Sequence, residues 1–298
     1  MLNETFVAYL QEAIKKYWTY KALSNYEGDS LSFGETGIEI KKLHSFFEKA
    51  GVKRGDKISL IGKNGNTWAL TYLATTSYGA VIVPLLQDFH PDDVTHLVNH
   101  SDSVMLFISD SIYEKLDKSR ISNLKAVVSL DGFSIIQAID SHVDDAMEQA
   151  KNQPYNLTPE NFNFDPVGND QLLGIIYTSG TSGFSKGVML SHNSLATNVW
   201  FGHHNIDLRP GDNIVSFLPL AHAYGCAFEF LTPFSMGCNI NFLGRIPSPQ
   251  IVLKAFSELR PKLVLSVPLI IEKIYKNQIK PALEKPIVQV LVHTPGLN

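Results

Sequence analysis

The residues best suited to chemistry are a short stretch of glycines, hydroxyl side chains and one lysine at positions 177–188. The stretch reads Tyr-Thr-Ser-Gly-Thr-Ser-Gly-Phe-Ser-Lys-Gly-Val and directly follows the apolar run 172–176. Glycines let backbone N–H groups converge on an anion, the hydroxyls add further donors, and Lys186 adds a positive charge. This composition predicts a loop that binds the phosphates of a nucleotide.

Two common nucleotide-binding motifs do not fit this stretch. A P-loop has four residues between its first glycine and a Gly-Lys-Ser/Thr sequence. Counting from Gly180, Ser185 occupies the position of the second glycine, and Lys186 is followed by Gly187 instead of a hydroxyl residue. The G-x-G-x-x-G fingerprint of dinucleotide-binding folds is also absent. The other alternative, an ordinary surface turn, does not account for so many hydroxyls, glycines and a lysine after an apolar run.

Short apolar runs that alternate with helical periods must position this loop. The apolar runs predict strands over 57–61, 80–84, 104–109, 126–130, 172–177, 213–219, 239–243 and 263–267. After an amphipathic opening helix, the helical periods predict helices over 37–50, 67–78, 91–99, 133–150, 192–203, 223–236, 249–259 and 268–283. This alternation favours an α/β protein with parallel sheets wrapped by helices.

The segment 151–170 predicts a boundary in this organisation. It contains three prolines and five asparagines and shows little periodicity, which is typical of a connecting loop. We expect a first α/β subdomain over 1–155 and a second one over 156–298 that carries the phosphate loop.

The composition narrows the class of protein. With 44% hydrophobic residues, the 298-residue chain can bury a packed core. The net charge of −4 and the scattered basic residues offer no surface for nucleic acid, so we expect no nucleic-acid partner. Two cysteines exclude a disulfide framework, and no apolar stretch reaches the roughly 20 residues of a membrane span. We expect a cytoplasmic protein, at most peripheral to a membrane.

Two motifs carry a resemblance to a known family. The 177–188 stretch resembles the phosphate loop of the adenylate-forming enzymes, which include acyl-CoA synthetases, nonribosomal adenylation domains and luciferases. Ser185 stands where that family most often has proline. The sequence Leu-Pro-Leu-Ala-His-Ala-Tyr-Gly at 218–225 resembles the acid-binding segment of the same family. The likeness extends over 31–268, and the stretch 267–275 is similar to the long-chain fatty-acid branch.

The resemblance implies a fold and a reaction. The fold is the amino-terminal part of the acyl-CoA synthetase large domain, with two stacked, mostly parallel sheets wrapped by helices. ATP and a carboxylic acid, foremost a long-chain fatty acid, would give an acyl-adenylate and pyrophosphate, with Mg²⁺ as cofactor and coenzyme A as acyl acceptor. A ligase for a short-chain, aryl or amino acid, and a binding module without catalysis, are the alternatives.

Three later motifs of the family do not occur in the sequence. They supply a glutamate for Mg²⁺, an aspartate for the ribose and a carboxy-terminal lysine. We therefore expect an amino-terminal fragment that is inactive alone and that forms dimers through sheet edges left uncovered.

The resemblance also implies roles for individual residues. Lys186 and His222 would be catalytic, Lys186 at the β- and γ-phosphates and His222 beside the substrate carboxylate. ATP would contact Thr178, Ser179, Gly180, Thr181, Ser182, Gly183, Lys186 and Ala223. The acid pocket would include His222, Tyr224, Gly225 and Cys226. Thr178 would be a ligand of Mg²⁺. His192, His203 and His204 lack the nearby cysteines or paired carboxylates of a metal site.

Overall fold

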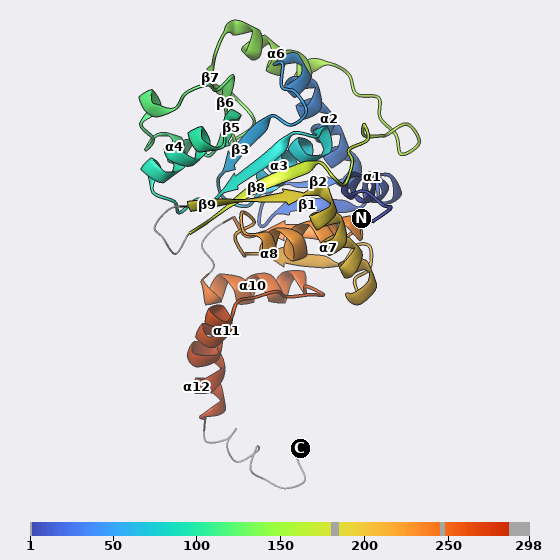
Figure 1. Ribbon diagram of the computed structural model, residues 1–298. Coiled ribbons are helices and arrows are strands. Elements are labelled where there is room, and N and C mark those ends of the chain that lie inside the picture. The colour runs from blue at the N-terminus through green and yellow to red at the C-terminus, as the bar shows by residue number, and fades with distance from the viewer. Residues whose placement is uncertain (1, 180–184, 245–247, 286–298) are drawn as a thin grey trace.

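Two β-sheets form the framework of the protein (Figure 1). The computed structural model describes residues 2–179, 185–244 and 248–285. The larger sheet has the strand order β7-β6-β5-β3-β4-β8-β9. Its strands are β3 (Lys57–Ile61), β4 (Val81–Leu85), β5 (Ser103–Ile108), β6 (Ala126–Ser129), β7 (Ile135–Ala138), β8 (Leu172–Ser179) and β9 (Ser185–Ser191). All neighbours are parallel except the two edge strands β7 and β9.

The smaller sheet has the order β10-β11-β1-β2. Its strands are β1 (Lys21–Asn25), β2 (Ser30–Ser32), β10 (Asn213–Ser216) and β11 (Asn239–Phe242). β10, β11 and β1 are parallel, and β2 is antiparallel to β1. The expected α/β class with two mostly parallel sheets is confirmed.

Both sheets take strands from either side of the boundary expected at residue 155. β8 and β9 join the larger sheet beside β4, although they follow the 151–170 connection. In the other direction, β1 from the start of the chain pairs with β11. Each sheet therefore contains strands from before and after residue 155, and the division into two subdomains stays a prediction.

Helices cover the sheets and connect the strands (Figure 1). They are α1 (Phe6–Lys16), α2 (Phe33–Lys49), α3 (Asn66–Tyr78), α4 (Pro91–His100), α5 (Asp110–Tyr113), η1 (Lys118–Arg120), α6 (Ser141–Asn152), α7 (His192–Asn205), α8 (Ala223–Gly225), η2 (Cys226–Leu231), α9 (Thr232–Ser235), α10 (Pro249–Leu259), α11 (Pro268–Ile274), η3 (Tyr275–Ile279) and α12 (Lys280–Leu283). Of these, η1 is a 3-10 helix, while η2 and η3 are π-helical. Among the described residues no helix is both long and apolar enough to cross a membrane.

Helix α3 lies between the two sheets. It contacts β3 and β4 of the larger sheet and β1 of the smaller one, and nearly all its side chains are buried. A helix that is buried all round needs partners for its polar groups. The hydroxyls of Thr71, Thr76 and Ser77 meet this need by donating to carbonyls one turn earlier, at 2.6–2.9 Å. The helix can therefore support both sheets, and the loop before it reaches their common edge.

Several predicted boundaries agree with the structure, others differ by a few residues, and two predicted elements are wrong in whole or in part. β3 and α10 have the predicted ranges, and α4 begins at Pro91 as expected. The predicted strand 263–267 is wrong, because only Leu263 forms a β-bridge, to Ile214. The predicted helix 133–150 is wrong in its first part, where β7 pairs antiparallel with β6. The turn between them places Gly132 and Phe133 at positive φ, which suits a tight hairpin.

Candidate active site

The carboxyl ends of three parallel strands meet at one edge of the larger sheet. β3 ends at Ile61, its neighbour β4 ends at Leu85, and β8, on the far side of β4, ends at Ser179. Ligands of open α/β sheets bind outside this kind of edge, because the loops that leave it converge there. The phosphate-loop sequence thus starts at the same edge as the loops after β3 and β4.

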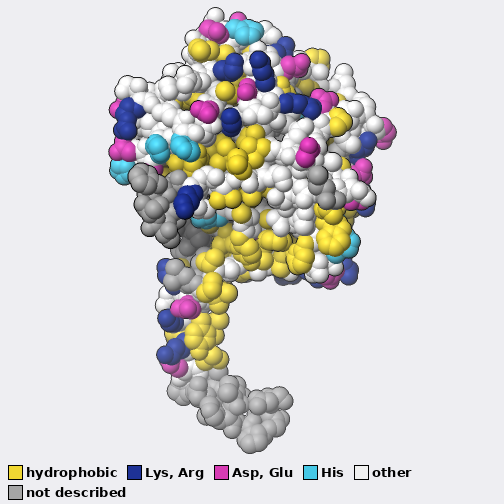
Figure 2. Space-filling model, viewed as in Figure 1, with side chains coloured by type: hydrophobic (Ala, Val, Ile, Leu, Met, Phe, Trp, Pro, Cys, Tyr) yellow, Lys and Arg dark blue, Asp and Glu magenta, His cyan; other side chains and the backbone are white. Residues whose placement is uncertain are grey.

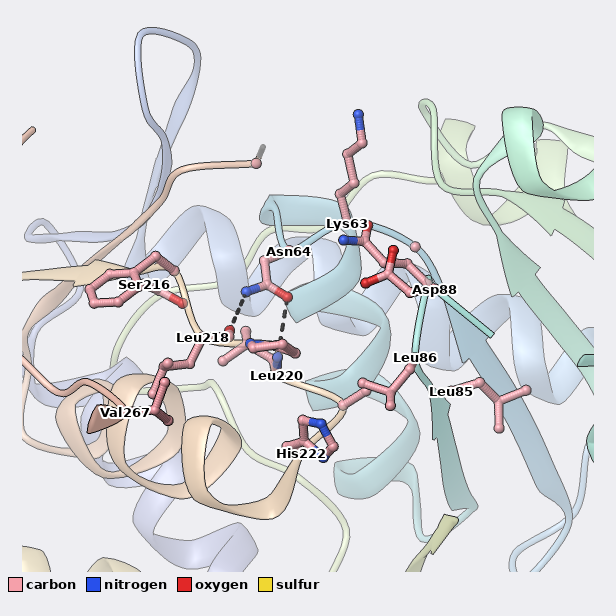
Figure 3. Close-up of a pocket in the computed structure, with 16 residues that line it drawn as sticks. Lys63, Asn64, Leu85, Leu86, Asp88, Ser216, Leu218, Leu220, His222 and Val267 are labelled. Atoms are coloured by element: carbon pink, nitrogen blue, oxygen red, sulfur yellow. Dashed lines mark hydrogen bonds between the residues drawn. The ribbon is translucent and has the colours of Figure 1, made fainter. Parts of the chain in front are cut away.

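A cavity of about 410 Å³ lies at this edge (Figure 3). Its wall is formed by residues 62–64 after β3, 85–88 at the end of β4, and 216–222 at the end of β10 and beyond. Gly244 and Val267 complete it. Because β10 belongs to the smaller sheet, the cavity is built by both sheets together.

The cavity wall contains both ionisable and apolar side chains. Lys63, Asp88 and His222 are exposed, so their ionisable groups face solvent. Leu85 and Leu220 are buried beneath them. A cavity with polar groups at its rim and an apolar floor suits a small molecule that has a charged end.

Asn64 connects the loops of the two sheets across the cavity wall (Figure 3). Its Nδ2 donates to the carbonyl oxygen of Leu218 at 2.8 Å, and its Oδ1 accepts from the backbone N–H of Leu220 at 3.3 Å. A carboxamide has both a donor and an acceptor, so one side chain fixes both ends of the Leu-Pro-Leu sequence. The loop after β3 thereby sets the position of the segment that leads to His222.

The phosphate-loop sequence joins two antiparallel strands. β8 pairs with β9 so that Thr178 lies opposite Lys186. Both residues are exposed, and directly opposite residues of an antiparallel pair have their side chains on the same face of the sheet. The predicted phosphate contacts Gly180, Thr181, Ser182 and Gly183 lie outside the described residues. Ser179 is the last residue of β8.

The strand that leads into this hairpin is fixed by a buried tyrosine. The hydroxyl of Tyr177 lies 2.7 Å from Nδ1 of His100, at the end of α4. Burial raises the pKa of Tyr177, and Asp102 adds a smaller effect in the same direction. Since the tyrosine stays neutral, it supports the position of the neighbouring Thr178 without adding charge.

The fit of Mg²⁺ rests on Thr178 alone among the described residues. No group of three or more His, Cys, Asp or Glu side chains in the described part of the chain could hold a metal ion. Mg²⁺ takes oxygen ligands and is often held by one or two protein groups together with substrate phosphates and water. An exposed threonine hydroxyl beside a phosphate loop fits that kind of site.

His222 ends the loop that forms the second side of the cavity. Its backbone N–H donates to the carbonyl oxygen of Pro219 at 3.0 Å, and its own carbonyl accepts from the N–H of Cys226 at the same distance. His222 is thus the residue before α8, with its side chain in the cavity wall. Lys186 and His222 lie on segments from different sheets.

The remaining predicted pocket residues lie just behind His222. Gly225 and Cys226 are buried, and a Cβ on Gly225 would lie 3.1 Å from the carbonyl oxygen of Pro219. Burial raises the pKa of the Cys226 thiol to about 12. Ala223 is exposed. Neither Gly225 nor Cys226 lines the 410 Å³ cavity, and the roles expected for these three residues stay predictions.

Tyr224 lines a second, more apolar cavity of about 320 Å³. Phe217 belongs to both cavities, so they are neighbours. The other lining residues are Val252, Phe256, Val264, Leu265, Ser266 and Ile271. An apolar chain could continue from the first cavity towards this one.

Sequence reasoning missed three parts of the site. The wall residues Lys63 and Asp88 have no pattern of their own, because they come together only through the order of β3 and β4. Glu229 was also missed, although a lone carboxyl residue within Cys-Ala-Phe-Glu-Phe-Leu is a visible signal of a buried polar contact. It lies completely buried behind the cavity wall.

Comparison with known proteins identifies the family. The sequence profile of the AMP-binding enzyme family matches residues 10–292. Since the match covers nearly all of the chain, the protein belongs to the AMP-binding enzyme family.

Individual relatives and a solved structure are similar over most of this chain. The long chain acyl-CoA synthetase 6, peroxisomal, of Arabidopsis thaliana is 29% identical over 250 residues, which cover 82% of this chain. The 4-coumarate–CoA ligase-like 6 of the same plant is 26% identical over 234 residues, or 76% of this chain. The crystal structure of ATP-bound MatB from Rhodopseudomonas palustris has the same fold, with a TM-score of 0.74, 20% identity and 92% of this chain covered.

The chain covers a smaller share of these proteins. The matches span 35% of the acyl-CoA synthetase and 39% of the coumarate–CoA ligase-like protein. They span 52% of the MatB chain.

Proposed function

We propose that the protein activates a long-chain fatty acid with ATP, first as the acyl-adenylate and then as the coenzyme A thioester. The observation that carries the proposal is the meeting of two motifs at one sheet edge. The Thr178–Lys186 pair opens at the carboxyl end of β8, beside β4, and the end of β4 lines the cavity that holds His222. The segments of the proposed phosphate-binding pair and of the proposed acid-binding residue thus both border the end of β4, which supports the proposal.

The adenylation step has a definite charge demand. A carboxylate oxygen of the acid bonds to the α-phosphorus, and the bond from that phosphorus to the β-phosphate oxygen breaks, which releases pyrophosphate. Negative charge grows on the leaving group, so preorganised donors at its oxygens speed the step. In our proposal Lys186 donates to the β- and γ-phosphates.

The acid must also be held in line with the α-phosphate. His222 orients the carboxylate from the cavity wall. Thr178 would be the oxygen ligand that this chain offers to Mg²⁺, which, when bound, would supply positive charge to balance that of the phosphates. The thiol of coenzyme A then attacks the acyl carbon of the adenylate, and AMP leaves.

The proposal of a long acyl chain rests on the apolar cavity and on the relatives. The cavity that Tyr224 and Phe217 line is apolar and lies next to the site. The acyl-CoA synthetase relative from Arabidopsis thaliana is a long-chain enzyme by name, which favours the same class of acid here. The coumarate–CoA ligase-like relative makes an aryl acid the rival substrate.

An ATP–pyrophosphate exchange assay over different acids tests the proposal. Because the chain spans only part of its relatives, the assay uses the full product of the gene. We expect exchange with long-chain acids such as myristate and palmitate, and little with acetate, coumarate or amino acids. Exchange with coumarate alone would replace the fatty acid by an aryl acid, and no acid-dependent exchange would overturn the function.

A further inference from the structure

The buried carboxyl group of Glu229 contacts the back of the cavity wall. Its Oε2 accepts the backbone N–H of Phe217 at 3.1 Å and that of Leu218 at 3.0 Å. The residue is 0% exposed and lies in the π-helical segment η2. The proposed mechanism gives Glu229 no role at a ligand.

The backbone of Leu218 is consequently hydrogen-bonded on both sides of its Cα. Its N–H donates to Glu229, and its carbonyl oxygen accepts from Nδ2 of Asn64. Phe217 and Leu218 both line the cavity, and His222 follows four residues later. A change at Glu229 would therefore act on the cavity through the backbone.

The π-helical segment aims the carboxyl group at this backbone. π-helical turns insert an extra residue into a helix and often occur at functional sites. Pro233 follows Glu229 by four residues and has no N–H to donate to the Glu229 carbonyl, so a regular α-helical bond is impossible there.

The position of the carboxyl group is costly and therefore informative. Its second oxygen, Oε1, is buried and makes no hydrogen bond to a described residue, and the Ser216 side chain offsets only part of the effect of burial on the carboxyl group. An apolar side chain would avoid this cost but could not accept the two N–H groups. Burial raises the pKa of Glu229 to about 8, so the neutral carboxyl, which still offers an acceptor oxygen, is the main form at neutral pH.

We propose that Glu229 is a positioning residue, which fixes the 217–222 segment and through it the acid-binding wall that carries His222. The inference rests on the proposed function for its link to the acid. Its structural half, the bonds to the two amides, is independent of that function.

Two variants separate the bonds from simple packing. Glu229→Gln keeps an acceptor oxygen at the same reach, whereas Glu229→Leu has a similar size and no acceptor. Thr75→Val is the matched control, because Thr75 is also 0% exposed and its Oγ1 also lacks a partner among the described residues, but it lies in α3. It removes a buried polar atom at a residue that lines neither cavity.

Hydrogen exchange on the 298-residue chain tests the bonds. We expect Glu229→Leu to speed exchange of the Phe217 and Leu218 amides by tenfold or more, while Glu229→Gln and Thr75→Val stay within about threefold of the wild type. Unchanged amides in Glu229→Leu would overturn the proposal. If Glu229→Leu does not fold, the test uses the wild type alone. Exchange of the Phe217 and Leu218 amides at the rate of solvent-exposed amides would then overturn the proposal.

Pyrophosphate-exchange kinetics on the full gene product test the positioning role. We expect Glu229→Leu to raise the KM for the acid about tenfold or to lower kcat by a similar factor, with the KM for ATP within twofold and with rescue in Glu229→Gln. Equal losses for acid and ATP, as a general loss of structure would give, would overturn the role. A wild type without acid-dependent exchange would overturn the proposed function, and the amide result would still stand by itself.

Discussion

At the scale of one residue, replacing Lys186 tests the proposed phosphate-binding half of the site. It lies exposed opposite Thr178, so its replacement should leave the fold intact. In the full gene product, we expect Lys186→Ala to slow ATP–pyrophosphate exchange by about 10²–10³, the usual effect of losing one preorganised donor.

Lys254→Ala is the control for this variant. Lys254 is an exposed lysine on α10 that pairs with Glu27 at 2.7 Å, and it lines neither of the two cavities. The control should keep wild-type exchange. An unchanged rate in Lys186→Ala would remove the lysine from the mechanism.

Replacing His222 tests the proposed acid-binding half of the site. Its side chain lies in the cavity wall, and its backbone bonds to Pro219 and Cys226 do not depend on the imidazole. We expect His222→Ala to raise the KM for the acid or to slow adenylation, at an unchanged KM for ATP. His204→Ala, which changes an exposed histidine of α7, is the control, and identical kinetics of the two variants would refute the role.

Glu229 predicts a pH-dependent difference in stability. Its pKa rises on folding from 4.5 to about 8, mainly because burial disfavours the charged form. The folded state therefore binds this proton more tightly, and the contribution to stability is complete below pH 4.5 and is lost as the pH rises towards 8.

Glu229→Gln replaces the titratable carboxyl group by an amide that does not titrate. We expect the variant to gain stability relative to the wild type between about pH 5 and about pH 9, by at most about 5 kcal/mol. Denaturant unfolding of both proteins at several pH values measures the difference. Parallel stability curves would mean that the carboxyl group is not desolvated as the structure indicates.

At the scale of elements, Asn64 joins the loop after β3 to the loop after β10. Asn64→Ala removes its bonds to Leu218 and Leu220. We expect a loss of about 1–3 kcal/mol in the free energy of unfolding, together with a higher KM for the acid, because the cavity wall loses its contact with the other sheet.

Asn99→Ala is the matched control for the element-scale prediction. The Asn99 amide also makes two bonds to a neighbouring loop, to Arg120 and Ser122, but away from the cavity. The control should lose similar stability and keep the KM for the acid. A KM effect of equal size in both variants would show that Asn64 acts through stability alone.

Local sequence patterns and strand pairing explain which helices and strands were predictable from the sequence. α10 and β3 have strong periodic patterns and matched their predicted ranges. β9 and β1 were missed, because their apolar residues are limited to Val-Met-Leu within Ser-Lys-Gly-Val-Met-Leu-Ser and to Ala-Leu within Lys-Ala-Leu-Ser-Asn, which are too short for a strand pattern. Pairing with β8 and β11 determines these two strands, and pairing is not visible in a local window.

At the scale of the whole molecule, the carboxy-terminal helices extend away from the two sheets (Figure 1). Figure 2 shows a row of hydrophobic side chains along one side of this extension. Ile271, Tyr275 and Ile279 are 57%, 47% and 45% exposed. Exposed apolar area of this kind favours association.

We predict that the 298-residue chain forms dimers or larger assemblies at micromolar concentration, measured by light scattering after size exclusion. Ile271→Glu combined with Ile279→Glu should shift the population towards the monomer. Ile139→Glu, at an exposed isoleucine after β7, should not. A monomeric wild type would contradict the prediction.

The sequence by itself determined the family, the α/β class and the two motifs around Lys186 and His222. These are local signals, since glycines, hydroxyls and a lysine have their chemistry wherever the chain places them, and apolar periods report burial directly. The tertiary structure decided which residues share the site. Strand order brings 62–64 and 85–88 to the cavity, and the contact of η2 with the segment after β10 places Glu229 behind it. Such neighbours are far apart in the chain and meet only when the sheets form.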